Sequence, residues 1–405
     1  MIRSLFSAIS GLRNHQTMMD VVGNNISNVN TTGFKSSTTV FQDVLSQVVR
    51  GGGAATEALG GTNPAQVGLG SRVAAITTNY GQGALQRTGR ATDLAIQGDG
   101  FFVVEQAGQQ LFTRAGSFSI DALGRLVTQE GAFIQGWQGD AEGNVNTNGG
   151  IAQIQIPVGD LVNPVATSAA TPGVTLGGNL PSTAEIGDVI TNSVEVFDAQ
   201  GNPVSLTIEF EKTADDEWSV GYRYVNAAGD TTPAPADPAT AMTPGTLEFD
   251  ADTGELTTPA DFNLVLSGVG DLDDIAVSLG AAGGPNRLTQ FGELSTAAIL
   301  SQGGSAAGSL QSFSVSQEGL VIGAYSNGRT RAIGQIALAS FANPEGLEKV
   351  GGSNFRTTMN SGLAQLGTAG AGGRGLMSSG TLEMSNVDLA QEFTNLIIAQ
   401  RGFQA

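Results

Sequence analysis

The feature that most constrains this 405-residue chain is a helical stripe of apolar residues at each end. The steps between members of each stripe are three or four residues, close to the heptad interval of paired helices. Each stripe also contains one glutamine, a residue that can fix the register between helices. The first stripe consists of Leu5, Ile9, Leu12, Gln16, Met19, Val22 and Ile26, and the second of Leu389, Phe393, Leu396, Gln400 and Phe403.

Both stripes need cover, since a helix face this apolar is seldom left in water. Periodicity alone is compatible with two core helices of a globular domain. The alternative is that the two ends pair with each other and with neighbouring copies of the chain. Little adjoining sequence could cover the stripes, which favours this second interpretation. We therefore expect residues 1–30 and 380–405 to form one terminal helical domain.

The sequence between the stripes has the pattern of short β-strands joined by glycine turns, as in "GDGFFVV" and "GAFIQGW". Glycine-rich segments at 51–70 and 367–375 are predicted to be flexible connectors. The expected fold is mainly β with paired N- and C-terminal α-helices, in a nested multidomain chain with two β-rich domains and a terminal helical coiled coil. Its other expected parts are a connector (31–75 plus 356–379), an inner β domain (76–150 plus 290–355) and an outer acidic β domain (151–289).

Strand pairs can be predicted in two places. A hairpin is expected around Gln317 to Gly319. In the outer region, two segments alternate between apolar and polar residues, the period of a strand with one packed and one solvated face. The apolar positions are Val204, Leu206, Ile208 and Phe210 in the first segment and Trp218, Val220, Tyr222 and Tyr224 in the second.

The net charge of −19 is concentrated in the middle of the chain. From Glu185 to Arg287, 19 acidic residues stand against three basic ones, a net charge of −16. Such a surface disfavours nucleic acid and anionic lipid as partners. No run approaches the 18 apolar residues of a membrane span, and the absence of cysteine excludes disulfides and thiolate metal sites. We expect no nucleic-acid partner and no membrane insertion.

Catalytic or metal-binding groups are scarce. His15 is the only histidine and falls on the polar side of the first stripe, so we expect it on a solvated face. "DADTGE" (250–255) lacks the ligand spacing of a calcium loop and is predicted to be a turn. Paired carboxylates of a glycosidase could come from any of 37 acidic residues, but nothing selects a pair. We predict no catalytic residues, no metal site and no cofactor.

The first stripe ends in an unusually polar corner, "GNNISNVNTTGFKSS". Asparagine bonds nearby backbone and tolerates left-handed geometry, and glycine adds conformational freedom. One hypothesis is that the corner turns the chain outward and contacts neighbouring subunits; the other is an elaborate helix cap with no such role. Its residues are Asn24, Asn25, Asn28, Asn30, Gly33 and Phe34.

Several motifs resemble the bacterial flagellar rod and hook axial proteins. "SLFSAISGLRNHQTMMDVVGNNISNVNTTGFK" is similar to their N-terminal signature, and "SNVDLAQEFTNLIIAQRGFQA" to their C-terminal one. "GDGFFVV", "FTRAGSF" and "GRLVTQEGAFIQGW" resemble their inner β domain. The resemblance covers roughly residues 1–150 and 290–405. The large outer insertion resembles hook members more than the shorter rod members.

This resemblance implies a non-enzymatic structural subunit of the flagellar hook, which self-assembles into a hollow, curved tube. The tube would act as a universal joint that transmits motor torque to the filament. The resemblance further implies an extracellular place in the hook and basal body, and a homo-polymer whose inner wall is built by the two stripes. The implied partners are the distal rod protein, the hook cap protein, the hook–filament junction protein and the flagellar type III export machinery.

Alternatives remain at this stage. A distal rod subunit would form a straight tube, and an extracellular β-rich adhesin or glycan-binding protein would stay a monomer or small oligomer. Members of the resembled family continue their C-terminal helix beyond the point that matches Ala405, so the resemblance leaves open whether this chain is truncated there. The segment 51–70 is long and glycine-rich for that family, which marks it as a place where contacts in the joint could differ.

Overall fold

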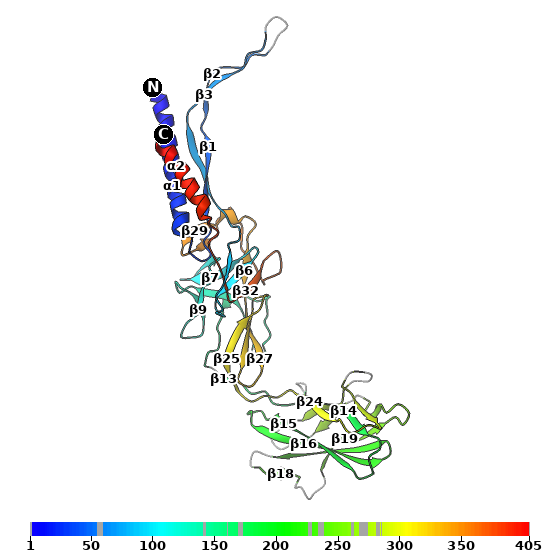
Figure 1. Ribbon diagram of the computed structural model, residues 1–405. Helices are drawn as coiled ribbons and strands as arrows, with labels where there is room; N and C mark the ends of the chain where they lie inside the picture. Colours follow the sequence, from blue (N-terminus) through cyan, green and yellow to red (C-terminus); the bar gives the residue numbers. More distant parts are fainter. Residues whose placement is uncertain are drawn as a thin grey trace. The chain divides into compact units, whose positions relative to one another are not determined.

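The computed structural model describes residues 2–54, 60–140, 143–159, 161–168, 173–225, 229–233, 239–260, 263–266, 274–280, 284 and 286–404. The chain forms two compact units. An α-helix stands at each end of a chain that is otherwise mainly β, which confirms the predicted fold class (Figure 1). The predicted division into four parts stays a prediction. Unit 1 comprises Met1–Val158, Ser312–Gly323 and Thr330–Ala405, and unit 2 comprises Gly159–Gln311 and Ala324–Arg329.

The two terminal helices of unit 1, α1 (Ile2–Ser27) and α2 (Leu389–Gln404), lie side by side. They run antiparallel, because the start of α1 and the end of α2 lie at the same end of the pair (Figure 1). The Asp388 carboxylate caps α2 by accepting hydrogen bonds from the backbone N–H groups of Ala390 and Gln391. Neither helix, as far as the structure describes them, is long and apolar enough to cross a lipid bilayer.

Two antiparallel β-ribbons follow α1. In the first, β1 (Ser37–Asp43) pairs with β4 (Ser71–Thr78). In the second, β2 (Ser46–Arg50) pairs with β3 (Ala65–Gly68), and a further bridge joins Gly53 to Thr62.

This second ribbon corrects the prediction of a flexible connector at 51–70. Of that segment, 55–59 lie outside the described residues, and the remainder contains β3 and the bridge to Gly53. The valines in "SQVVR" and "AQVG" are β-branched residues that favour strands despite the surrounding glycines. The predicted connector 367–375 is also fixed locally, since the Arg374 side chain donates a hydrogen bond to the Thr368 carbonyl.

The β part of unit 1 is organised around the hairpin of β7 (Phe101–Gln106) and β8 (Gln109–Thr113). Phe101, Phe112 and Phe355 meet in its core. The short pairs β6 (Leu94–Gln97) with β32 (Leu376–Ser379) and β5 (Leu85–Arg87) with β33 (Thr381–Glu383) lead towards α2. The remaining elements are β9 (Phe118–Ile120), β10 (Leu126–Thr128), β11 (Phe133–Gln138), β12 (Ala152–Gln153), β27 (Thr330–Ile336), β28 (Leu338–Ser340), a 3₁₀ turn (Pro344–Gly346), β29 (Glu348–Gly351), β30 (Asn354–Arg356) and β31 (Gln365–Gly367). Two further strands, β25 (Gly308–Val315) and β26 (Leu320–Tyr325), have residues in both units. Strands β25 and β26 are neighbours around Ser316–Gly319, which confirms the predicted hairpin.

Unit 2 is a β domain with its own apolar core. The predicted meander is confirmed: β16 (Pro203–Ala214) pairs with β17 (Glu217–Val225), Leu206 lies opposite Tyr224, and Phe210 lies opposite Val220. The "DADTGE" segment is a turn between strands, as predicted. The other strands are β13 (Leu161–Val162), β14 (Val174–Pro181), β15 (Val189–Phe197), β18 (Thr231–Thr232), β19 (Thr240–Phe249), β20 (Leu256–Thr258), β21 (Asn263–Leu266), β22 (Ile275–Ser278), β23 (Leu288–Phe291) and β24 (Ala298–Gln302).

One turn design recurs in both units, in "DALGR" and "DAQGN". The carboxylates of Asp121 and Asp198 accept hydrogen bonds from backbone N–H groups two and four residues later. Gly124 and Gly201 adopt φ of +79° and +82°, values that favour glycine. These turns explain how a glycine-rich sequence forms many short strands.

Candidate assembly surface

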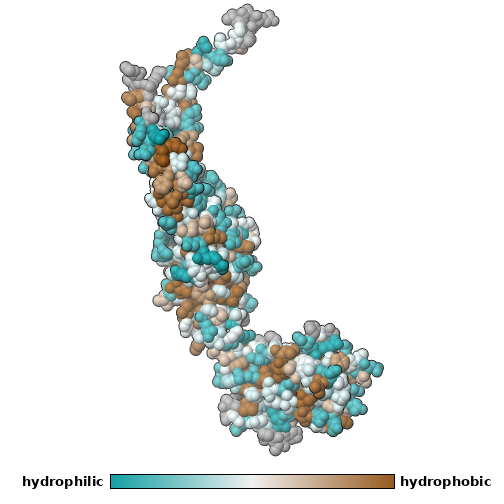
Figure 2. Space-filling model, viewed as in Figure 1, coloured by the Kyte–Doolittle hydropathy of each residue, from teal (hydrophilic) through white to brown (hydrophobic). Residues whose placement is uncertain are grey.

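The terminal helices expose much of their apolar surface in the single chain. Leu5 is 62% exposed and Phe393 is 50% exposed, and Phe6, Ile397 and Ile398 extend the apolar surface beyond the predicted stripes. Figure 2 shows apolar side chains gathered along the helix pair. Large exposed apolar surfaces mark sites of contact with another protein or a membrane.

The structure divides the predicted stripe residues by their exposure. The predicted residues of α1 from Met19 onwards are buried or half-buried, whereas those before it and four of the five on α2 are exposed. Their assignment to a polymer interface stays a prediction. Val22 is buried, Met19, Ile26 and Leu396 are half-buried, and Leu5, Ile9, Leu12, Gln16, Leu389, Phe393, Gln400 and Phe403 are exposed.

The face of α2 that is covered is offset from the predicted stripe. It contains Glu392 and Ala399, which are buried, and Gly402, whose Cα lies so close to His15 that an added Cβ would be 2.6 Å from the imidazole. The expectation that His15 lies on a solvated face is therefore wrong. Its ring is half-buried, and its centroid lies 6.0 Å from that of Phe41. A small residue on α2 makes this close approach between the helices possible.

The polar corner joins α1 to β1 through one buried side chain. Asn25 is 1% exposed, its Nδ2 donates to the Ser37 carbonyl (2.8 Å), and its Oδ1 accepts from the Ser37 N–H (3.0 Å). The amide thus pairs with Ser37 as a neighbouring strand would. This pairing fixes the direction in which the chain leaves the helix.

The other corner residues support the same turn. Asn28 donates to the carbonyl of Asn24, and Asn24 and Asn30 are exposed. Gly33 adopts φ +67°, donates its N–H to the Glu383 carbonyl (2.7 Å), and leaves no space for a Cβ beside the Ala115 backbone. A subunit contact and a helix cap both remain compatible with this geometry.

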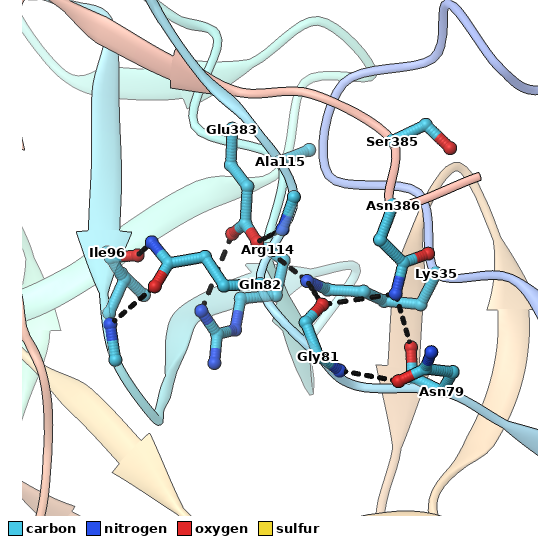
Figure 3. Close-up of polar contacts among 12 residues, drawn as sticks. Lys35, Asn79, Gly81, Gln82, Ile96, Arg114, Ala115, Glu383, Ser385 and Asn386 are labelled. Atoms are coloured by element: carbon cyan, nitrogen blue, oxygen red, sulfur yellow. Dashed lines mark hydrogen bonds and ion pairs between the residues drawn. The ribbon is translucent and has the colours of Figure 1, made fainter. Parts of the chain in front are cut away.

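Behind the corner lies a buried ion cluster that joins distant parts of the chain (Figure 3). Lys35 Nζ lies 2.6 Å from Glu383 Oε1, and both side chains are fully buried. Arg114 Nη1 lies 3.4 Å from the second oxygen, Glu383 Oε2. One carboxylate therefore binds two cations, from the segment after α1, the end of β8 and the strand before α2.

Neutral groups complete the hydrogen bonding around the cluster. Lys35 Nζ also donates to the Gly81 carbonyl (2.9 Å), and the Gly83 N–H donates to Glu383 Oε1 (2.9 Å). Asn386 accepts from the Ser36 N–H and donates to the carbonyls of Asn79 and Gly81. Removal of one partner from a buried ion pair strongly destabilises a folded protein. The cluster can therefore hold the four chain segments that supply its groups in one geometry.

Burial dominates the electrostatics of the cluster. It lowers the pKa of Lys35, and the attraction of Glu383 opposes that change. Burial likewise lowers the pKa of Arg114, against the attraction of Glu383 and Asp99. The cluster is structural in character, because its carboxylate is bound by two cations and by a backbone N–H. Within the described ranges, no group of three or more His, Cys, Asp or Glu side chains could hold a metal ion.

Comparison with known proteins places these features in a family. The chain is 38% identical to the flagellar hook protein FlgE of Treponema pallidum, with all of this chain and 96% of that protein aligned. The chain belongs to the flagellar hook protein family. The hook protein FlgE of Borreliella burgdorferi is 40% identical over all of this chain and 96% of its own length. The flagellar basal-body rod protein FlgG of Bacillus subtilis is 30% identical, over all of this chain and 92% of its own length.

Four domain families of hook and rod proteins match successive parts of the chain. The "Flagella basal body rod protein" family matches 5–35, and the "Flagellar hook protein FlgE/F/G D1 domain" matches 95–171. The "Flagellar basal body protein FlaE D2 domain" matches 181–319, and the "Flagellar basal body rod FlgEFG protein C-terminal" family matches 378–405. The crystal structure of Helicobacter pylori flagellar hook protein FlgE2 shares the fold, with a TM-score of 0.57 at 16% identity, over 74% of this chain and all of that one.

Sequence reasoning missed the ion cluster of this hook-family chain. Lys35 and Glu383 are 348 positions apart, so no local motif joins them. A weak signal existed, because the chain has only three lysines and Lys35 is the only charged residue between Asp20 and Asp43. An isolated charge in a charge-poor terminal segment is a candidate for a buried pair.

Proposed function

We propose that this chain is a structural subunit of the bacterial flagellar hook. Copies assemble through the terminal helices into a hollow, curved tube that acts as a universal joint and transmits motor torque to the filament. The observation that carries this proposal is the exposed apolar surface of the helix pair in a chain of the hook family. The exposed stripe residues, such as Leu5 and Phe393, become the contacts between copies.

The ion cluster gives the tube a mechanical connection. A force applied to the helices reaches the β part of unit 1 through the chain segments that Lys35, Arg114 and Glu383 hold together. The corner, with Asn25 bonded to Ser37, sets the angle between α1 and the first ribbon. In this proposal, the corner and cluster keep the inner wall coupled to the outer parts while the tube bends.

The remaining roles follow from the family and extend this proposal. The tube stands outside the cell, and its subunits travel through the flagellar type III export machinery. At its ends it meets the distal rod protein, the hook cap protein and the hook–filament junction protein. The subunit has no enzymatic activity. Higher identity to hook than to rod relatives, at 40% against 30%, supports a hook subunit over a rod subunit.

The test is salt-induced assembly of the purified chain, followed by sedimentation and electron microscopy. The intact chain should form tubes, and a variant that lacks residues 1–30 should remain unassembled. The matched control is Leu161→Ser, which removes an exposed apolar side chain from unit 2. This variant should assemble normally. Tubes from the deletion variant would contradict assembly through the helices.

A further inference from the structure

A pocket of about 400 Å³ opens beside the polar corner in unit 1. Its walls come from the corner, from the segment around β8 and β10, and from β29 and β30. Most of the lining side chains are hydroxyls and amides, which can donate hydrogen bonds. They include Asn28, Thr31, Thr128, Gln129 and Asn354.

Lys349 lies on the wall of this pocket, and its ammonium binds only neutral groups among the described residues. Its Nζ donates to the Lys35 carbonyl and to the Ser37 hydroxyl, both at 2.9 Å, and lies 5.1 Å from the centre of the Phe34 ring. The described residues form no salt bridge with it. Partial burial lowers the pKa of Lys349.

Lys35 and Glu130 also line the pocket. Lys35 is paired with Glu383, whereas Glu130 accepts a hydrogen bond from the neutral Asn354 Nδ2 at 3.2 Å. Lys349 therefore remains as a cation that could bind an additional anion. A carboxylate would gain charge-assisted hydrogen bonds from its ammonium and further donors from the hydroxyl and amide walls.

We propose that this pocket receives an acidic side chain from a second copy of the chain, whose carboxylate pairs with Lys349. Charge complementarity favours this occupant, because each copy carries 37 acidic residues against 18 basic ones. The pocket also adjoins the corner that leads from α1, so it lies close to the helices that bring copies together. The inference rests on the proposed function, since it requires neighbouring copies in a tube.

The sequence provides a clean test by zero-length cross-linking. A carbodiimide joins an amine to a carboxylate that it already contacts, and Lys349 is the one exposed lysine of three. Lys35 and Lys212 are 1% and 3% exposed. Tubes grown from an equal mixture of ¹⁴N- and ¹⁵N-labelled subunits should yield a Lys349 peptide linked to an acidic peptide in mixed-isotope pairs. Mass spectrometry identifies the acidic residue.

Three variants test the role of the charge. Lys349→Gln should raise the critical concentration for assembly about tenfold, and Lys349→Arg should restore it. Arg356→Gln is the matched control, because Arg356 is a half-exposed cation already paired with Glu348, and it should assemble like the parent. Urea unfolding of the monomers separates assembly effects from lost contacts with Lys35 and Ser37.

The outcomes are distinct from those of the proposed function. Tubes in which Lys349 is linked only within its own copy, or not linked at all, would overturn the pocket contact and leave the tube itself intact. Equal critical concentrations for the parent and Lys349→Gln would also overturn it. A chain that forms no tubes would instead contradict the proposed function.

Discussion

The apolar residues of unit 2 and those of the terminal helices differ in burial. In unit 2 the alternating residues of β16 and β17 enter a closed core, where Leu206, Phe210 and Trp218 are fully buried. In the helices the heptad-like residues Leu5 and Phe393 stay in water. A complete core can fold alone, whereas an exposed helical surface gains its stabilisation from another chain. Unit 2 closes its core within one chain, whereas in the proposed tube the exposed face of the helices is covered by neighbouring copies.

The chain offers a convenient probe for this comparison, since its two tryptophans fall one in each unit. Trp137 lies in unit 1 and Trp218 in unit 2. Fluorescence of Trp218→Phe and Trp137→Phe backgrounds therefore reports the unfolding of each unit separately.

The largest effect is expected from Glu383→Gln. This change leaves Lys35 and Arg114 buried without their shared anion, which should cost about 3–5 kcal/mol in the free energy of unfolding of unit 1. Urea unfolding followed by Trp137 fluorescence measures it. The control is Glu348→Gln, which breaks the half-exposed pair with Arg356 and should cost about 1 kcal/mol or less. Equal losses in both variants would show that the cluster does not hold unit 1 together.

Leu206→Ala should lower the free energy of unfolding of unit 2 by a comparable amount and leave that of unit 1 unchanged. Removal of this fully buried side chain leaves a cavity that should cost about 2–5 kcal/mol in the unfolding of unit 2. Trp218 fluorescence should report the change, and Trp137 fluorescence should not. Tube formation should persist under conditions where unit 2 remains folded. Loss of tubes from folded subunits would show that the outer core also determines assembly.

A smaller effect is expected from Asn25→Ala at the corner. The variant removes the hydrogen-bond partner of the Ser37 N–H and carbonyl. This loss should lower the free energy of unfolding of unit 1 by about 1–3 kcal/mol. The exposed Asn24→Ala is the matched control. Sedimentation of the same variants, together with Asn28→Ala, distinguishes the two corner hypotheses. Failed assembly with an intact monomer supports a subunit contact, and normal assembly leaves a helix cap.

The smallest effect concerns the exposed turns. Burial acts to raise the pKa of Asp198, but backbone and side-chain hydrogen bonds from Asn202 and its neighbours together outweigh it and hold this pKa below its usual value. A depressed folded-state pKa stabilises the fold above the unfolded pKa, and this stabilisation disappears as pH falls through the folded value. Unfolding of unit 2 between pH 5 and 2 should therefore show a steeper loss in the parent than in Asp198→Asn. Identical pH profiles would exclude a contribution from this turn.

Much of the fold could be predicted where the pattern is local. The period of two in β16 and β17 identified paired strands and their packed face, and the heptad-like spacing identified both helices. The sequence did not predict the β2–β3 ribbon, because its strands are short and the surrounding segment is rich in glycine, which is typical of a flexible connector. His15 was misplaced because its neighbour, Gly402, comes from the other end of the chain. The ion cluster was not predicted for the same reason, because its members are far apart in the sequence and become neighbours only in the folded chain.

The measurement that tests the central claim most directly is amide hydrogen exchange in free subunits and in assembled tubes. Assembly should slow exchange strongly in residues 5–22 and 389–403, because neighbouring copies cover the helices. Exchange in β16 and β17 should change little, since their core is already closed. Protection that appears in unit 2 while the helices exchange at the same rate in subunit and tube would contradict assembly through the terminal helices.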